Sequence, residues 1–139
     1  MKLTFDQSQY FSVTEKLLSI LNTELAKLTE PQSDSLGITF NFRDPDYSTD
    51  KGGFHPVEIR LNKHNNQWHF EYITDFSFQG FPYPELVKEI DICFHSKEVS
   101  TFYGVGMNKR ESDEFIEHFI GNFINYVEMG VFTVRIGFD

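Results

Sequence analysis

A run of alternating side chains between Gln67 and Phe78 constrains the fold more than any other feature of this sequence. Every second residue from Trp68 onward is aromatic or threonine, and most residues between them are polar. Successive side chains of a β-strand point to opposite faces of a sheet, so this period of two predicts a strand with one apolar face. The residues that we predict to be buried are Trp68, Phe70, Tyr72, Thr74 and Phe76. Those that we predict to be exposed or hydrogen-bonded are Gln67, His69, Glu71 and Asp75.

Shorter segments with the same alternation surround this strand. They predict further strands at residues 36–43, 57–62, 86–94, 99–105 and 131–138. Apolar residues at helical spacing predict one amphipathic helix over residues 13–28, with a capping box from Ser12 to Glu15, and a second over residues 112–129. The order helix, five strands, helix, strand predicts an α+β fold, in which an antiparallel β-sheet meander is flanked by an N-terminal and a C-terminal helix. No linker or repeat divides the chain, so we expect a single domain over residues 1–139.

The charge and the composition limit the classes of partner and location. The net charge of −9 repels phosphate backbones, so we expect no nucleic-acid partner. No apolar run approaches the roughly twenty residues of a membrane-spanning helix, so we expect no membrane role. The single cysteine permits no disulfide within the chain, and no apolar secretory segment follows the first residues, so we expect a cytoplasmic protein. Because 16 of the 139 residues are phenylalanine, the core should be rich in Phe.

No catalytic or cofactor-binding signature stands out. The sequence holds no nucleophile–histidine motif and no glycine-rich phosphate-binding pattern, so we predict no catalytic residues and no cofactor. Cys93 and His95 lie on one predicted strand face, as two metal ligands would. No second cysteine or closely spaced histidine pair completes a set of three or four ligands, so we predict no metal site.

The segment RDPDYSTDKGGFHPVEIR, residues 43–60, is the strongest candidate for a binding loop. Asp44 begins an alternation of oxygen-bearing residues like that of an EF-hand calcium loop. The sixth and twelfth positions, however, hold Thr49 and His55 where such a loop needs Gly and Glu, so we predict no calcium binding of that kind. Asp-Pro and Gly-Gly also form turns, and a turn between two strands is the simpler interpretation. If the loop binds a ligand, the candidate residues are Arg43, Asp44, Tyr47, His55 and Glu58.

The second predicted helix contains residues with poor helix propensity. Gly121 costs about 1 kcal/mol relative to Ala inside a helix, which suggests that another backbone passes close to it. Its apolar arc is wider than packing on one sheet face requires, and the last strand offers a free edge. We therefore predict a homo-oligomer, most simply a two-fold dimer, with the second helix or the terminal strand at the contact. The candidate interface residues are Gly121, Asn122, Asn125 and Glu128. Two alternatives stay open: Gly121 allows the helix to approach its own sheet, and the polar residues satisfy buried backbone groups.

Three segments together resemble a known family. They are NFRDPDYS…GGFHPVEIR at residues 41–60, ITDFS at residues 73–77 and GNFINYVEMG at residues 121–130. Over nearly its whole length the chain resembles the bacterial domain-of-unknown-function family 2787, found in vibrios and their relatives. The resemblance implies a fold similar to that of the acidic mitochondrial matrix protein family, an antiparallel sheet with terminal helices that forms oligomers and binds diverse proteins. It implies no reaction, because no enzymatic activity is established for the family.

Two functional hypotheses follow. The first is a non-enzymatic acidic oligomer that binds other proteins, and it predicts a filled Phe core and a large symmetric contact. The second is a small-molecule-binding or enzymatic domain with a pocket between a helix and a curved sheet, lined by the aromatic face from Trp68 to Phe78. Its convergent polar groups would be Arg43, Tyr47, His55 and Glu58, and it predicts an enclosed cavity beside His55.

Overall fold

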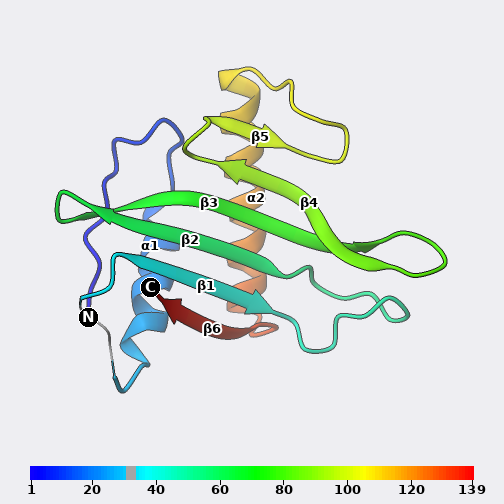
Figure 1. Cartoon of the computed structure of the whole chain (residues 1–139), viewed down its shortest axis with the longest axis horizontal. Helices are drawn as coiled ribbons and strands as arrows, with labels where there is room; N and C mark the ends of the chain where they lie inside the picture. Colours follow the sequence, from blue (N-terminus) through cyan, green and yellow to red (C-terminus); the bar gives the residue numbers. More distant parts are fainter. Residues whose placement is uncertain (31–33) are drawn as a thin grey trace.

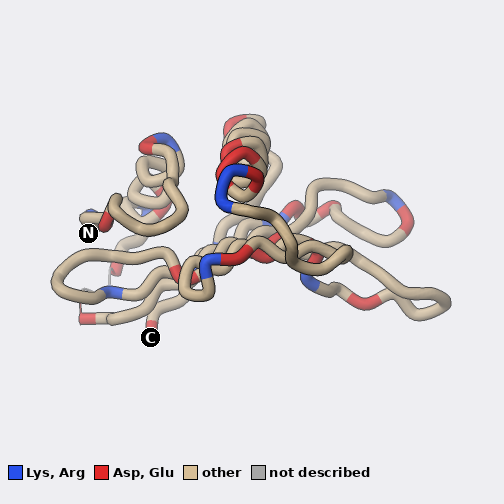
Figure 2. The backbone as a smooth tube through the Cα atoms, turned by 90° about the horizontal axis from the view of Figure 1, so that it is seen from above, with Lys and Arg blue, Asp and Glu red and all other residues tan. Residues whose placement is uncertain are grey.

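The computed structural model describes residues 1–30 and 34–139, and it confirms the predicted α+β fold. Two helices, α1 (Glu15–Ala26) and α2 (Lys109–Glu128), lie on the same face of one six-stranded sheet (Figures 1 and 2). The strands are β1 (Gly37–Arg43), β2 (Val57–His64), β3 (Gln67–Gln79), β4 (Glu85–Cys93), β5 (Glu98–Ser100) and β6 (Thr133–Phe138). We call the sheet face that carries the helices the helix face and the other one the open face. Neither helix is long and apolar enough to cross a membrane.

The strand order is β5-β4-β3-β2-β1-β6, and every pairing is antiparallel. The first five strands form the predicted meander. Helix α2 then crosses behind the sheet, steeply inclined to the strands, and returns the chain to the opposite edge (Figure 1). Strand β6 pairs there with β1 and is an edge strand, which is the position that our oligomer prediction requires of it.

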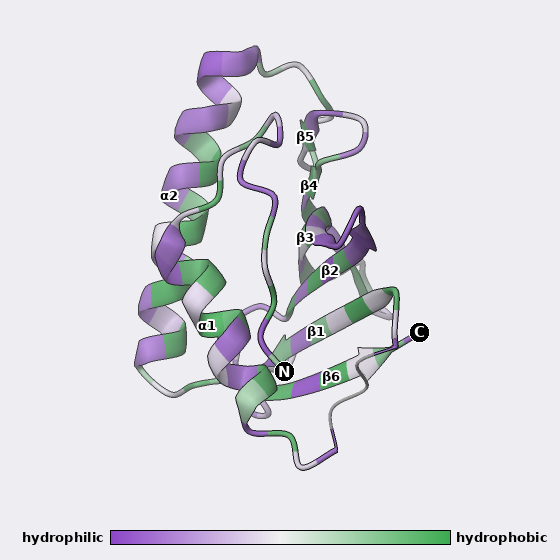
Figure 3. Cartoon of the chain, turned by 90° about the vertical axis from the view of Figure 1, so that its left-hand side faces the viewer, coloured by the Kyte–Doolittle hydropathy of each residue, from purple (hydrophilic) through white to green (hydrophobic). Residues whose placement is uncertain are grey.

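The core fills the layer between the helices and the sheet. In Figure 3 the hydrophobic sides of both helices face the sheet, and the hydrophilic sides face outward. The buried phenylalanines of this layer are Phe5, Phe11, Phe40, Phe42, Phe70, Phe94 and Phe123. The prediction of a Phe-rich core is confirmed, because the helix face of a sheet of this size needs large side chains to reach the helices above it.

Strand β3 departs from strict alternation, and the predicted burial is correct only for part of it. Trp68, Phe70 and Thr74 are buried as predicted. The pairing with β2 shifts by one residue next to Leu61, because Glu71 has no partner there and forms a β-bulge. A bulge exchanges the two faces for the residues that follow, so Asp75 lies buried on the helix face, whereas Tyr72 is only half-buried. The prediction was therefore wrong for Tyr72 and Phe76, and the proposed aromatic lining from Trp68 to Phe78 is not one face.

Two further predictions need correction. Helix α1 begins after Thr14, whose side chain makes no capping hydrogen bond, so the predicted capping box from Ser12 to Glu15 is absent. A complete capping box stands instead at the start of α2, where Asn108 and Glu111 each accept the other's backbone N–H.

The fifth strand is shorter than predicted. It ends at Ser100, because Thr101 and Gly104 exchange two backbone hydrogen bonds and turn the chain away from the sheet. Gly104 and Gly106 both have positive φ angles, which a continuing strand would not adopt. Tyr103, predicted to lie in the strand, is 99% exposed.

Candidate functional site

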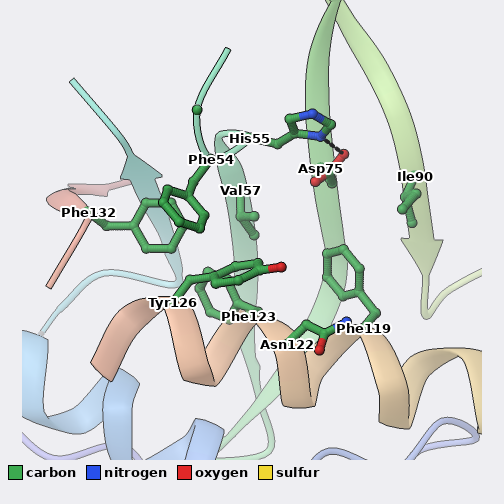
Figure 4. Close-up of a pocket in the computed structure, with 11 residues that line it drawn as sticks. Phe54, His55, Val57, Asp75, Ile90, Phe119, Asn122, Phe123, Tyr126 and Phe132 are labelled. Atoms are coloured by element: carbon green, nitrogen blue, oxygen red, sulfur yellow. Dashed lines mark hydrogen bonds and ion pairs between the residues drawn. The ribbon is translucent and has the colours of Figure 1, made fainter. Parts of the chain in front are cut away.

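A pocket of about 270 Å³ lies between α2 and one end of the sheet, beside His55. Its walls come from the β1–β2 connection, the helix face of β2, β3 and β4, the middle of α2 and the start of the segment that leads to β6. Figure 4 shows the lining residues, with α2 along one side and the strands behind. The second hypothesis predicted an enclosed cavity beside His55 lined by the aromatic residues of β3; the pocket lies beside His55, but it is open to solvent and Asp75 is the residue that β3 contributes to it.

Aromatic rings form one side of this pocket. Phe54 and Tyr126 have ring centroids 4.7 Å apart, and Phe123 and Phe132 lie 5.6 Å apart. In Figure 4 these four rings gather on the side away from His55. They offer an apolar surface to a ligand. Both pairs are tilted, a geometry within the range that aromatic side chains prefer.

His55 and Asp75 line the opposite side, and Glu89 completes a cluster of three titratable side chains beside it. His55 Nδ1 lies 3.2 Å from Asp75 Oδ1 and 3.7 Å from Glu89 Oε2. Asp75 is buried, with only 7% of its surface exposed, whereas His55 and Glu89 are half-buried. Figure 4 shows the His55–Asp75 hydrogen bond at the edge of the pocket. The cluster therefore presents one imidazole and a buried carboxylate to any ligand that enters.

The surroundings shift the pKa values of the pair in the same direction. The hydrogen bond to Asp75 raises the pKa of His55, and this effect exceeds the opposing effect of burial. Burial raises the pKa of the Asp75 carboxyl, although the neighbouring His55 acts in the opposite direction. The folded protein therefore holds protons at this pair up to a higher pH than the unfolded chain does.

Two β-bulges bring the cluster together. The bulge at Glu71 turns Asp75 to the helix face, as described above. A second irregularity lies where Asp75 pairs with Ile90 but Phe76 pairs with Lys88, so Glu89 is the extra residue of β4. Bulges occur frequently beside functional sites, where they redirect a side chain. Sequence reasoning singled out His55 but missed Asp75 and Glu89, because alternation counted from Trp68 places Asp75 on the exposed face.

The structure separates the predicted ligand-binding residues. His55 lines the pocket, whereas Arg43, Asp44, Tyr47 and Glu58 line a different groove, on the open face. In that groove Glu58 accepts a hydrogen bond from the hydroxyl of Tyr72. Burial, and secondarily this bond, raise the pKa of Tyr72.

Asp44 has a structural role in the β1–β2 connection. Its carboxylate accepts the backbone N–H groups of Asp46, at 2.9 Å, and Phe54, at 3.0 Å. These bonds close the loop in front of His55. Tyr47 extends the same arrangement, since its ring centroid lies 5.4 Å from that of His55 and its hydroxyl accepts the N–H of Phe78. The hydrogen bonds of Asp44 and Tyr47 thus hold the β1–β2 connection, and this connection determines the position of His55.

The predicted interface residues lie along α2. Asn122 lines the pocket, and Gly121, Asn125 and Glu128 are exposed. Glu128 forms an ion pair of 2.5 Å with Lys16 of α1. A methyl group added at Gly121 would meet no atom of the described residues within 4 Å, so the alternative that Gly121 lets α2 approach its own sheet is wrong. Whether another chain covers Gly121 stays a prediction.

Comparisons with known proteins identify relatives without a known role. A hypothetical protein from the VSP-II pathogenicity island of Vibrio cholerae superimposes with a TM-score of 0.90 and 34% identity, covering 99% of this chain and 100% of its own. A second match is a conserved hypothetical protein from the pathogenicity island VPI-2 of Vibrio cholerae O1 biovar eltor, which is described as sharing structural homology with the human P32 protein. It superimposes with a TM-score of 0.74 and 30% identity, and the match covers 93% of this chain and 97% of that protein. No curated protein matches. The model of a family described as protein of unknown function matches residues 15–137, and the chain therefore belongs to the domain-of-unknown-function family 2787.

Proposed function

We propose that this protein binds a small molecule in the pocket beside His55. The ligand has an apolar, ring-sized body and one polar end. The observation that carries the proposal is the division of the pocket into an aromatic side and a side with a buried carboxylate, because ligand sites typically combine apolar walls with a few fixed polar groups. The volume of about 270 Å³ is slightly below the roughly 300–1,000 Å³ of pockets for drug-sized ligands, so the ligand is small.

The orientation of the ligand follows from the two sides. Its ring lies against Phe54 and Tyr126, where it removes apolar surface from water at roughly 25 cal/mol per Å². Its polar end reaches His55 and Asp75, which need a hydrogen-bonding partner once the ligand excludes water. A ligand without that polar end would leave these groups without partners and bind more weakly.

Ligand-observed NMR with a library of single-ring fragments tests the proposal. The protein is kept in EDTA, so that metal ions do not contribute. Asn122→Phe places a ring in the pocket, and Glu117→Phe places the same ring on the exposed side of α2. We expect fragments that bind the wild-type protein and Glu117→Phe to lose binding in Asn122→Phe. No fragment binding, or equal binding to both variants, would refute a ligand in this pocket.

A second candidate function is the binding of another protein, and it has its own observation. Phe81 and Tyr83, in the β3–β4 connection, and Tyr103, in the β5–α2 connection, are almost fully exposed. Exposed large apolar side chains of this kind are common at protein contacts. Replacing Phe81, Tyr83 and Tyr103 together by Ser tests this function. If these side chains form the contact, the triple variant should no longer bind the partner or second copy that the wild-type protein binds, and its free energy of unfolding should be unchanged.

A further inference from the structure

We propose that His55, Asp75 and Glu89 bind a divalent first-row transition metal ion at the edge of the pocket. Each residue contributes one ligand atom, and these three atoms lie within 4.8 Å of one another. The proposal goes beyond the small-molecule function, since it depends on the three side chains alone.

The distances suit a shared metal ion. Zinc binds imidazole nitrogen and carboxylate oxygen at about 2.0–2.2 Å, which places neighbouring ligand atoms about 2.8–3.6 Å apart in octahedral or tetrahedral geometry. His55 Nδ1 is 3.2 Å from the Asp75 oxygen and 3.7 Å from the Glu89 oxygen. The Glu89 oxygen lies just beyond that range, and the three ligand atoms lie within 4.8 Å of one another, so binding requires the half-buried Glu89 side chain to move toward the other two.

The charges of the cluster favour a cation. Among the residues that the structure describes, no lysine or arginine forms an ion pair with Asp75 or Glu89. Two carboxylates therefore share a single imidazole, whose charge is at most +1. A buried carboxylate is costly unless it is paired or coordinates a metal, and a divalent ion would neutralise both carboxylates while His55 binds it in the neutral form.

The backbone also directs these groups toward one point. Glu89 is the extra residue of the bulge in β4, and Asp75 pairs at that same bulge. His55 comes from the β1–β2 connection, so the three ligands come from three separate segments that the sheet holds in place. With three protein ligands, positions on the metal stay open toward the pocket, where water or a ligand atom would complete the coordination.

The ligand types indicate which metals fit. Imidazole suits zinc, copper, iron and nickel, whereas magnesium and calcium prefer a complete set of oxygen ligands. One nitrogen and two carboxylate oxygens therefore favour ions such as Zn²⁺ and Fe²⁺ over Mg²⁺, and Mn²⁺ is accepted through the two carboxylates. We use Zn²⁺ alone as the thermodynamic probe and Mn²⁺ as the structural probe.

Isothermal titration of EDTA-treated and dialysed protein with Zn²⁺ tests the proposal. We expect one ion per chain, and we expect Glu89→Gln and His55→Gln to weaken binding by at least about tenfold, because even residues outside the first coordination sphere change metal affinity by 10–100-fold. Glu85→Gln removes an exposed carboxylate from the same strand and should leave the affinity unchanged. Saturable binding that Glu89→Gln leaves unaltered, or no saturable binding below about a millimolar concentration of Zn²⁺, would overturn the proposal.

Paramagnetic broadening by Mn²⁺ gives an independent readout. The side-chain amide signal of Asn122, in the pocket, should broaden first, and that of Asn66, in the β2–β3 turn at the opposite end of the sheet, should not (Figure 1). Equal broadening of both signals would show binding dispersed over surface carboxylates and contradict a built site. No organic ligand is present in either experiment, so failure here leaves the fragment test of the pocket unaffected, and the reverse also holds.

Discussion

The loop that carries His55 depends on Gly53, where any side chain would be both strained and crowded. Gly53 has φ +127°, and a Cβ atom there would lie 2.8 Å from Asp44 Oδ2 and 3.1 Å from Tyr47 Cα. The adjacent Gly52 has φ +68°, and a Cβ atom there would meet nothing within 4 Å in the part of the chain that the structure describes. The variants Gly53→Ala and Gly52→Ala therefore make the same chemical change in neighbouring positions with different surroundings.

The expected costs follow from those surroundings. Gly52→Ala introduces only a left-handed alanine, which costs about 1 kcal/mol. Gly53→Ala adds a steric conflict that the chain relieves only by moving Tyr47 or the Asp44 carboxylate. Asp44 accepts two backbone hydrogen bonds, and bonds to a charged group contribute about 1.5 kcal/mol each or more. We expect the free energy of unfolding to fall by about 3 kcal/mol in Gly53→Ala.

Urea unfolding at 25 °C measures both variants, with unchanged m-values as the condition for comparison. The difference between them should be about 2 kcal/mol, and Gly53→Ala should also weaken Zn²⁺ binding because the loop places His55. If the two variants differ by less than about 0.5 kcal/mol, the packing of Asp44 and Tyr47 against Gly53 does not hold the loop.

Three further predictions concern the core, the pH dependence and the assembly. Phe42→Ala should lower the free energy of unfolding by about 3–5 kcal/mol, because Phe42 is fully buried, whereas Phe81→Ala, at a residue 97% exposed, should change it by less than about 0.5 kcal/mol in the same urea assay. In metal-free protein the free energy of unfolding should fall as the pH rises above about 6.5, the ordinary pKa of His55, because the raised pKa of His55 makes its protonated form a source of stability that is lost above the folded value. His55→Gln should flatten this dependence. The raised pKa of Asp75 has the same sign, but its effect begins at the ordinary carboxyl value of 3.8. Light scattering coupled to size exclusion should give the mass of two chains, and Gly121→Leu should reduce it to one without unfolding; a single-chain mass that does not change with concentration would rule the oligomer out.

The order of elements was predictable from local patterns. Period-two alternation located β1, β2, β3 and β4, and helical spacing located α1 and α2, because each of these elements buries one side against the same core. The position of β6 beside β1 depends on how α2 crosses the sheet, and that crossing is set by tertiary packing that no local pattern contains.

The polar side of the pocket was not predictable in the same way. Its three residues are far apart in the sequence, and two of them owe their direction to bulges. A bulge at Glu71 leaves no composition signal, because glutamate is common at exposed strand positions. The one available hint was the acidic residue Asp75 in the apolar-rich segment from Tyr72 to Phe76, and using it required knowledge of the face on which that residue lies.

The bulge at Glu71 also explains why the aromatic run of β3 serves two purposes. Before the bulge, Trp68 and Phe70 pack into the core, and after it Phe78 lies on the open face. There the ring of Phe78 stacks on Tyr47 with centroids 5.2 Å apart, and the Tyr47 ring also lies 5.4 Å from that of His55. The second half of the run therefore supports the loop that carries His55. The same exchange of faces that turns Asp75 toward the pocket also provides the ring that holds its histidine partner in position.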